Sequence, residues 1–173
     1  MKTYLIILLF HFLMQQQNNY QIDFGEEKKG LYWSVVNDGV MGGLSRGRKK
    51  LTKNSLLFKG NVSLDNNGGF SSLRRSFSEF DISNFEYVEI KYRSSGISLA
   101  LTFAVSRRWY VPNYKVSLDE TSSKWKTVTI KLTDLRKYYI GKAMNEKLKK
   151  ETLKEIIRIG FITNEKKYGD FEF

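Results

Sequence analysis

Residues 86–104 read EYVEIKYRSSGISLALTFA, and this stretch decides the fold class. Apolar residues occupy every second position from Val88 to Tyr92 and again from Ile97 to Phe103, on either side of a turn at 94–96. A period of two is typical of a β-strand that turns one face to a core and the other to water. The stretch therefore predicts two strands of an antiparallel sheet.

The same pattern continues beyond this stretch. Residues 125–132 form a third strong candidate, and residues 146–157 have the spacing of a short amphipathic helix. One open sheet would leave an apolar face in water, so we predict an all-β sandwich of two antiparallel sheets with one short helix near the C-terminus. The weaker candidate strands are 31–36, 55–64, 70–75, 112–118, 156–162 and 169–173.

Composition limits the chemistry. The 173 residues include no Cys and one His, His11, so disulfides, thiolate nucleophiles, Ser–His–Asp triads and His-ligated catalytic metals are not expected. We therefore predict a non-enzyme with no metal and no cofactor. The net charge of +11 indicates a basic surface. Nucleic-acid surfaces interleave such charge with aromatic residues in a known module, and without one we expect no specific nucleic-acid partner.

The N-terminal segment is apolar from Tyr4 to Met14, after Lys2 and before a polar stretch at 15–19. It is too short to span a bilayer and resembles a secretory signal, although a buried strand or helix is the alternative. We expect residues 1–20 to be signal-like and residues 21–173 to form a single domain. The protein is then exported to the periplasm or the exterior if the signal is used, and is otherwise soluble and intracellular.

Two glycine-rich motifs punctuate the strands. Residues 33–45 read WSVVNDGVMGGLS and residues 58–74 read FKGNVSLDNNGGFSSLR. Their glycines and Asn-Asp pairs suit sharp turns, and Asn67-Gly68 predicts a tight hairpin whose two turn residues have positive φ. We assign a structural role to Gly39, Met41, Gly42, Gly43, Gly68, Gly69 and Phe70.

Together these motifs resemble the complex I intermediate-associated protein family. The resemblance extends from Trp33 through Trp125 and the IGFI stretch at 159–162 to residues 169–171. It implies a galactose-binding-like jelly-roll β-sandwich, in agreement with the periodicity. Mitochondrial relatives act as assembly factors that hold intermediates of respiratory complex I without catalysing a reaction.

Loop order locates a candidate binding surface. Loops alternate between the two ends of an antiparallel sandwich, so the loops at 37–43 and 65–69 are expected at the same end. Trp33, Phe70 and Trp125 are expected in the core, whereas Trp109 and Tyr110 are expected to be exposed. The ligand- or partner-binding candidates are Asn37, Asp38, Asp65, Asn66 and Asn67, with Arg93 and Arg74 near the rim.

Three functions fit this surface. The first is a non-catalytic module that binds a protein partner in an assembly or chaperone-like role. The second is a carbohydrate-binding module of an exported protein, since amides and carboxylates suit sugar hydroxyls. The third is a glycosidase-like enzyme, which would need the carboxyl groups of Asp38 and Asp65 roughly 5–9.5 Å apart across a cleft. Asp in an Asn-Asp-Gly turn is ordinarily structural, which argues against the third function. The family resemblance favours the first function over the second, which is suggested by fold analogy alone.

Overall fold

Antiparallel pairing connects all the sheet strands of the computed structural model, which describes residues 20–25, 32–79 and 81–173. The largest sheet has seven described strands, in the spatial order β1 (Trp33–Asn37), β4 (Ser71–Arg75), β12 (Arg158–Thr163), β7 (Leu99–Ala104), β8 (Asn113–Leu118), β10 (Arg136–Tyr139) and β11 (Lys142–Lys147). The opposing layer contains β2 (Arg46–Leu51), β3 (Leu56–Val62), β13 (Gly169–Glu172) and the short β6 (Ser95–Gly96).

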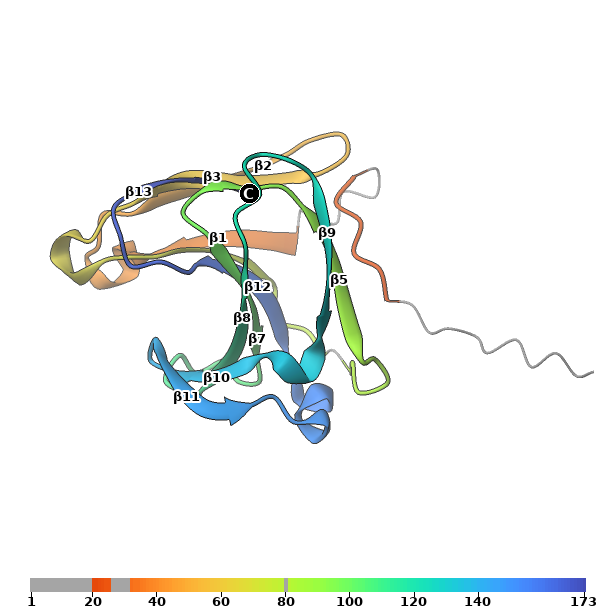
Figure 1. Ribbon diagram of the computed structural model, residues 1–173. Coiled ribbons are helices and arrows are strands. Elements are labelled where there is room, and N and C mark those ends of the chain that lie inside the picture. The colour runs from red at the N-terminus through yellow and green to blue at the C-terminus, as the bar shows by residue number, and fades with distance from the viewer. Residues whose placement is uncertain (1–19, 26–31, 80) are drawn as a thin grey trace, which may run out of the picture.

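A separate pair, β5 (Tyr87–Tyr92) and β9 (Lys126–Lys131), stands along one side of the sandwich (Figure 1). Val88 and Ile90 on β5 pack against the buried core, and Val128 and Ile130 on β9 do the same. The alternate positions on both strands are exposed. The pair therefore closes a flank of the core with one apolar face.

Aromatic and aliphatic side chains fill the space between the layers. The rings of Phe58 and Phe171 lie 4.8 Å apart, and Phe161 contacts both Trp33, at 5.7 Å, and Phe173, at 4.9 Å. Full burial of one such side chain stabilises the fold by about 1.5–3 kcal/mol. The all-β sandwich expected from the period of two is confirmed, and Trp33 lies in the core as predicted.

Several local predictions differ from the structure. The strand β2 is not predicted from the sequence, because its residues RGRKKL lack the alternation of apolar and polar side chains. It lies at the edge of its sheet. The predicted helix at 146–157 is shortened to one 3-10 helix, Lys150–Glu155, because β11 takes residues up to Lys147. Trp125, expected in the core, is 54% exposed and lies 5.5 Å from the guanidinium carbon of Arg93. Phe70, also expected in the core, is half-buried and does not belong to the core cluster.

The predicted signal-like segment lies, apart from Tyr20, outside the described residues. Within the part of the chain that the structure describes, none of the helices has the length and apolar character that crossing a bilayer requires.

Candidate functional site

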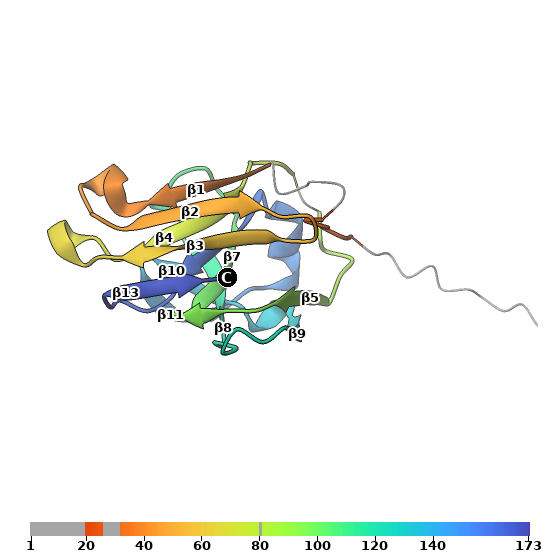
Figure 2. The ribbon, with the colours of Figure 1, turned by 90° about the horizontal axis from the view of Figure 1, so that it is seen from above.

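The two glycine-rich motifs form neighbouring loops, which we call the first loop (residues 38–45) and the second loop (residues 63–70). They project side by side from one end of the sandwich, orange and olive-yellow in Figure 2. Each contains a short 3-10 helix, Asp38–Met41 in the first loop and Asp65–Asn67 in the second. The order of loops predicts this shared end correctly.

The carboxylate of Asp38 ties the two loops together, and its residue is fully buried. Its Oδ1 accepts the backbone N–H of Ser45 at 3.0 Å, and its Oδ2 accepts the Ser45 hydroxyl at 2.5 Å. The same Oδ2 accepts the N–H groups of Gly69 at 2.6 Å and Phe70 at 3.2 Å. Burial opposes ionisation, but these hydrogen bonds outweigh it and lower the pKa of Asp38 below its ordinary value.

Two glycines leave room for this carboxylate. A Cβ on Gly43 would lie 2.4 Å from Asp38 Cγ, and a Cβ on Gly68 would lie 2.6 Å from Asp38 Oδ2. The hairpin prediction is wrong at Gly68, whose φ is −65°; the positive-φ residues are Asn66 and Asn67. Gly68 is therefore required by close approach and not by backbone conformation.

Further contacts fix the loops to their surroundings. Asn37 Oδ1 accepts hydrogen bonds from the N–H of Gly47 and the hydroxyl of Ser71. Asn66 donates its amide to the carbonyl of Gly42 at 3.1 Å. The side chains of Asn37 and Asn66 thus connect the loops to the strands and to each other.

Asp65 connects the second loop to a third. The Tyr168 hydroxyl donates to Asp65 Oδ1 at 2.7 Å, and the Ser63 hydroxyl donates to Oδ2 at 2.8 Å. The bond from Tyr168, followed by that from Ser63, lowers the pKa of Asp65. Both Asp65 and Asn67 are exposed.

Three large apolar side chains stand out from this polar framework. Val40 is 75% exposed, Met41 63% and Leu44 50%, and all three belong to the first loop. We call them the apolar tip. The sequence analysis assigns Met41 to a structural motif and does not single out Val40 or Leu44. In this loop the acidic Asp38 is buried and the apolar residues are exposed, and that arrangement depends on tertiary contacts that the local sequence does not show.

The two predicted rim arginines lie away from the loops. Arg93 is exposed beside Trp125 on the flank formed by β5 and β9. Arg74 is half-buried on β4. Successive side chains of a strand point to opposite faces, and the neighbouring Leu73 is buried in the core, so Arg74 points away from the core. Trp109 and Tyr110 are exposed, as predicted, at 77% and 46%.

Arg74 belongs to a group of positive side chains on the outward face of the seven-stranded sheet. The others are Lys115 on β8, Arg136 on β10 and Arg158 on β12, and we call the four the cation face. Sequence reasoning missed three of them. They are far apart in the chain, and only the strand order brings them to one surface.

The outer surface of the opposing sheet is charged in a different way. It carries a shallow depression of about 580 Å³ bordered by β2, β3, β13 and β6. Lys59 there lies 3.8 Å from Glu172, and Asn61 donates to Asp170 at 3.0 Å. Charges of both signs therefore face one another across that sheet.

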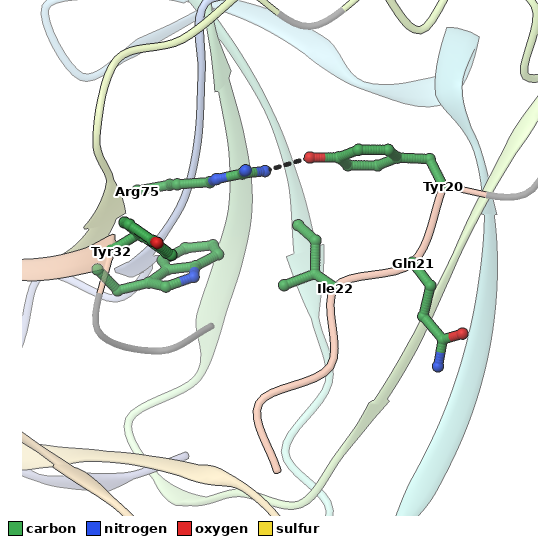
Figure 3. Close-up of a pocket in the computed structure, with 6 residues that line it drawn as sticks. Tyr20, Gln21, Ile22, Tyr32 and Arg75 are labelled. Atoms are coloured by element: carbon green, nitrogen blue, oxygen red, sulfur yellow. Dashed lines mark hydrogen bonds between the residues drawn. The ribbon is translucent and has the colours of Figure 1, made fainter. Parts of the chain in front are cut away.

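A smaller pocket of about 140 Å³ lies where the first described residues meet β1 and β4 (Figure 3). Arg75 donates to the Tyr20 hydroxyl at 2.5 Å, and Ile22 and Trp33 also line the pocket. The buried Nε1 of Trp33 has no hydrogen-bond acceptor in the described part of the chain. The pocket marks the place where this segment packs on the domain.

The carboxylates at this site already accept hydrogen bonds from within the protein, so the site is suited to binding contacts and not to acid–base chemistry by a carboxylate pair. Both oxygens of Asp38 and both of Asp65 accept hydrogen bonds from the loops, so they do not face each other as a free pair. Across residues 20–25, 32–79 and 81–173, no three His, Asp or Glu side chains gather where they could hold a metal ion.

Comparison with known proteins supports this fold. The family 11 carbohydrate-binding module from Clostridium thermocellum, in complex with a β-1,3-1,4-mixed-linked tetrasaccharide, aligns with a TM-score of 0.59 and 18% identity over 82% of this chain and 85% of that one. The family 11 module of the cellulosomal cellulase Lic26A-Cel5E from Clostridium thermocellum aligns with a TM-score of 0.57 and 18% identity, over 82% and 83%. At this identity the likeness shows the fold alone.

No curated protein sequence matches the chain. The family model described as complex I intermediate-associated protein 30 matches residues 22–173, nearly all of the described residues and both glycine-rich loops. The resemblance read from the two motifs is confirmed by this match. The chain belongs to the complex I intermediate-associated protein 30 family.

Proposed function

We propose that this protein is a non-catalytic binding module whose apolar tip docks onto a protein partner in an assembly or chaperone-like role. The observation that carries the proposal is the exposure of Val40, Met41 and Leu44 on a loop fixed from below by the Asp38 carboxylate. Exposed apolar groups that cluster within a polar rim mark interaction sites. The family name, which refers to association with a complex I intermediate, is consistent with a protein partner.

Rigidity makes such a tip effective. Asp38 receives hydrogen bonds from both loops, so their backbones are ordered before a partner arrives. A preordered loop loses little conformational entropy on binding, and the affinity for the partner is higher as a result. Burial of each apolar side chain at an interface contributes at most about 1.5–3 kcal/mol.

Site-specific crosslinking tests this proposal. A photo-crosslinking residue at position 41 is compared with one at position 140, where Ile140 is 57% exposed in the β10–β11 turn. Position 41 is expected to crosslink one protein in envelope extract, and the complex should withstand high salt because apolar contacts are not screened. Equal crosslinking at both positions, or capture of polyanions that elute at moderate salt, would contradict the proposal.

Serine substitutions measure the contribution of the tip. The variant V40S/M41S/L44S is expected to weaken binding of the captured partner by roughly a hundredfold, which corresponds to about 3 kcal/mol. Ile140→Ser is the matched control, because it removes an exposed apolar side chain elsewhere and should leave binding unchanged. An unchanged affinity in the triple variant, with an unchanged melting temperature, would exclude the tip as the docking surface.

Carbohydrate binding is the second candidate function. The specific observation in its favour is the polar character of the seven-stranded sheet's outward face, where Thr102, Asn113 and Ser117 alternate with apolar residues that are buried in the core or packed against it. Hydroxyl and amide groups on a broad surface suit saccharide hydroxyls. The two similar structures from Clostridium thermocellum are carbohydrate-binding modules, and one of them is in complex with a tetrasaccharide, which favours this candidate. A thermal-shift screen against neutral and acidic glycans tests it, because a ligand of the native state raises the melting temperature.

A further inference from the structure

The strand register places positive side chains in one row across the seven-stranded sheet. Residues directly opposite one another in an antiparallel pair point to the same face. Arg74 lies opposite Gly160, Gly160 opposite Thr102, Thr102 opposite Lys115, and Lys115 opposite Arg136. The row therefore runs from β4 to β10, perpendicular to the strands, with small residues between Arg74 and Lys115.

Arg158 lies beside this row on β12, two residues before Gly160. It lies over the ring of Phe77, with its guanidinium carbon 4.2 Å from the ring centroid. Arg107, which is exposed, approaches the same ring at 5.1 Å. Two guanidinium groups, that of Arg158 and that of Arg107 outside the four, therefore lie near one aromatic ring at this end of the cation face.

These cations have neutral partners only. Arg74 donates from Nε to the Ser72 hydroxyl at 2.7 Å, and Lys115 donates to Asn164 Oδ1 at 3.0 Å. No carboxylate among the described residues lies within ion-pair distance of any member of the cation face. Outside the four, Lys147 continues the row opposite Arg136 but is paired with Asp134 at 3.0 Å.

Donor groups also remain free at the surface. The terminal nitrogens of Arg74, and every guanidinium nitrogen of Arg158, have no acceptor among the residues that the structure describes. A guanidinium presents its N–H donors in a planar fork that matches a carboxylate or sulfate group. The guanidinium groups of Arg74 on β4 and Arg158 on the neighbouring β12 can therefore donate hydrogen bonds to the same oxyanion.

The local electrostatics favour an incoming anion. Burial, with a contribution from the positive charge of Arg158, lowers the pKa of Arg74 to about 10, and burial also lowers the pKa of Lys115. Both groups still carry their charges at neutral pH, so the repulsion between Arg74 and Arg158 persists in the free protein. A bound anion would relieve it.

We propose that the cation face binds an acidic glycan, a saccharide chain that bears carboxylate or sulfate groups. This inference rests on the carbohydrate-binding candidate above and specifies its ligand class and surface. Thr102 lies between Arg74 and Lys115 in the row, and Asn113 and Ser117 lie on either side of Lys115 along β8, so all three offer hydrogen-bonding groups for sugar hydroxyls near the cations. Hot spots for a protein partner combine Arg with large aromatic anchors such as Trp and Tyr, and none of the exposed large apolar side chains described belongs to this row. An acidic polypeptide is therefore the weaker occupant.

Binding assays on the full chain test the ligand class. Polygalacturonate and dextran sulfate represent carboxylated and sulfated glycans, mixed-linked β-glucan is the neutral glycan, and poly-glutamate is the acidic polypeptide. At least one acidic glycan is expected to bind about tenfold more tightly than the neutral glucan, which lacks the charge-assisted hydrogen bonds, and than poly-glutamate, which lacks the sugar hydroxyls. Which acidic glycan binds distinguishes carboxylate from sulfate recognition.

Matched variants test the surface. R74Q/K115Q/R158Q removes three charges from the cation face, and R48Q/K50Q/K91Q removes three from exposed positions on β2 and β5. The first triple is expected to lose acidic-glycan binding by tenfold or more, whereas the second should keep most of it. Arg136→Gln against Arg48→Gln repeats the comparison at two exposed positions, where folding is not at risk.

The outcomes separate this inference from the function on which it rests. Equal losses in the two triples, or poly-glutamate binding as tight as that of the acidic glycans, would show general attraction of polyanions to a basic protein and overturn the inference. Binding of the neutral glucan alone would overturn it too, while leaving carbohydrate binding intact. If no glycan binds, both the acidic-glycan inference and the carbohydrate-binding candidate are wrong.

Discussion

At the joined loops a buried charge is surrounded by hydrogen-bond donors, whereas the four cations on the outward face of the seven-stranded sheet have no carboxylate of the described residues within ion-pair distance. Asp38 accepts four hydrogen bonds, and its pKa is lowered below the ordinary value. Arg74, in contrast, is half-buried beside Arg158, and its pKa is lowered by burial and repulsion. The charge on Asp38 therefore stabilises the folded chain, whereas the charge on Arg74 destabilises it.

This difference separates structural from binding residues. A group whose hydrogen bonds are all made within the protein has little left to offer a ligand, whatever its type. A partly buried group with free donors is prepared for one. This difference is consistent with our two proposals, in which Asp38 supports the apolar tip and the four cations contact a ligand.

The largest effect is expected from removing the carboxylate at the loops. Asp38→Ala would leave the N–H groups of Ser45, Gly69 and Phe70 without their acceptor. An unsatisfied buried donor costs about 1–3 kcal/mol, so we expect a loss of about 3–5 kcal/mol in the free energy of unfolding, measured with urea. A loss below about 1 kcal/mol would show that Asp38 does not stabilise the loops.

Adding one methyl group beside this carboxylate should have the next largest effect. A Cβ at Gly68 would lie 2.6 Å from Asp38 Oδ2 and 2.9 Å from the carbonyl oxygen of Ser63, so Gly68→Ala is expected to destabilise by about 2–3 kcal/mol. Gly39→Ala is the control, because a Cβ there meets nothing within 4 Å, and its effect should stay within about 0.5 kcal/mol. Equal melting temperatures for the two variants would contradict the steric argument.

Acid should loosen the loops before it affects the sheet. The pKa of folded Asp38 lies below its ordinary value of 3.8, so the unfolded chain binds the proton more readily. Its contribution to stability is therefore complete above that value and is lost as the pH falls through the lower folded pKa. Hydrogen-exchange protection of the Gly69 and Phe70 amides should fall in this range, while that of Thr102 on β7 should persist. Simultaneous loss at all three amides would indicate global unfolding instead.

The sequence predicts the parts of this architecture that depend on local pattern. Strands with one apolar and one polar face, such as 86–93 and 97–104, are visible because the period of two records which face is buried. β2 leaves little trace, because an edge strand that carries Arg and Lys needs no apolar alternation. Trp125 was assigned to the core from its residue type, which does not record that β9 lies on the flank.

The candidate site is only half visible in the sequence. The two loops could be placed at one end by counting strands, but the burial of Asp38 between them depends on Ser45 and Gly69 arriving from both sides. The cation face could not be predicted. Its members come from strands whose spatial order, β4-β12-β7-β8-β10, follows from long-range pairing that residue spacing does not encode.

The smallest effect is expected from replacing one cation by an apolar side chain of similar length. Arg158→Met removes a charge that is partly buried and repels Arg74, and Met can keep the contact with Phe77. We expect the free energy of unfolding to rise by about 0.5–1 kcal/mol, as happens when a site kept for binding is relieved of strain. Arg48→Met, at an exposed position on β2, should leave the melting temperature unchanged. A destabilised Arg158→Met variant would mean that Arg158 serves the fold, and the distinction between the two regions would then no longer hold.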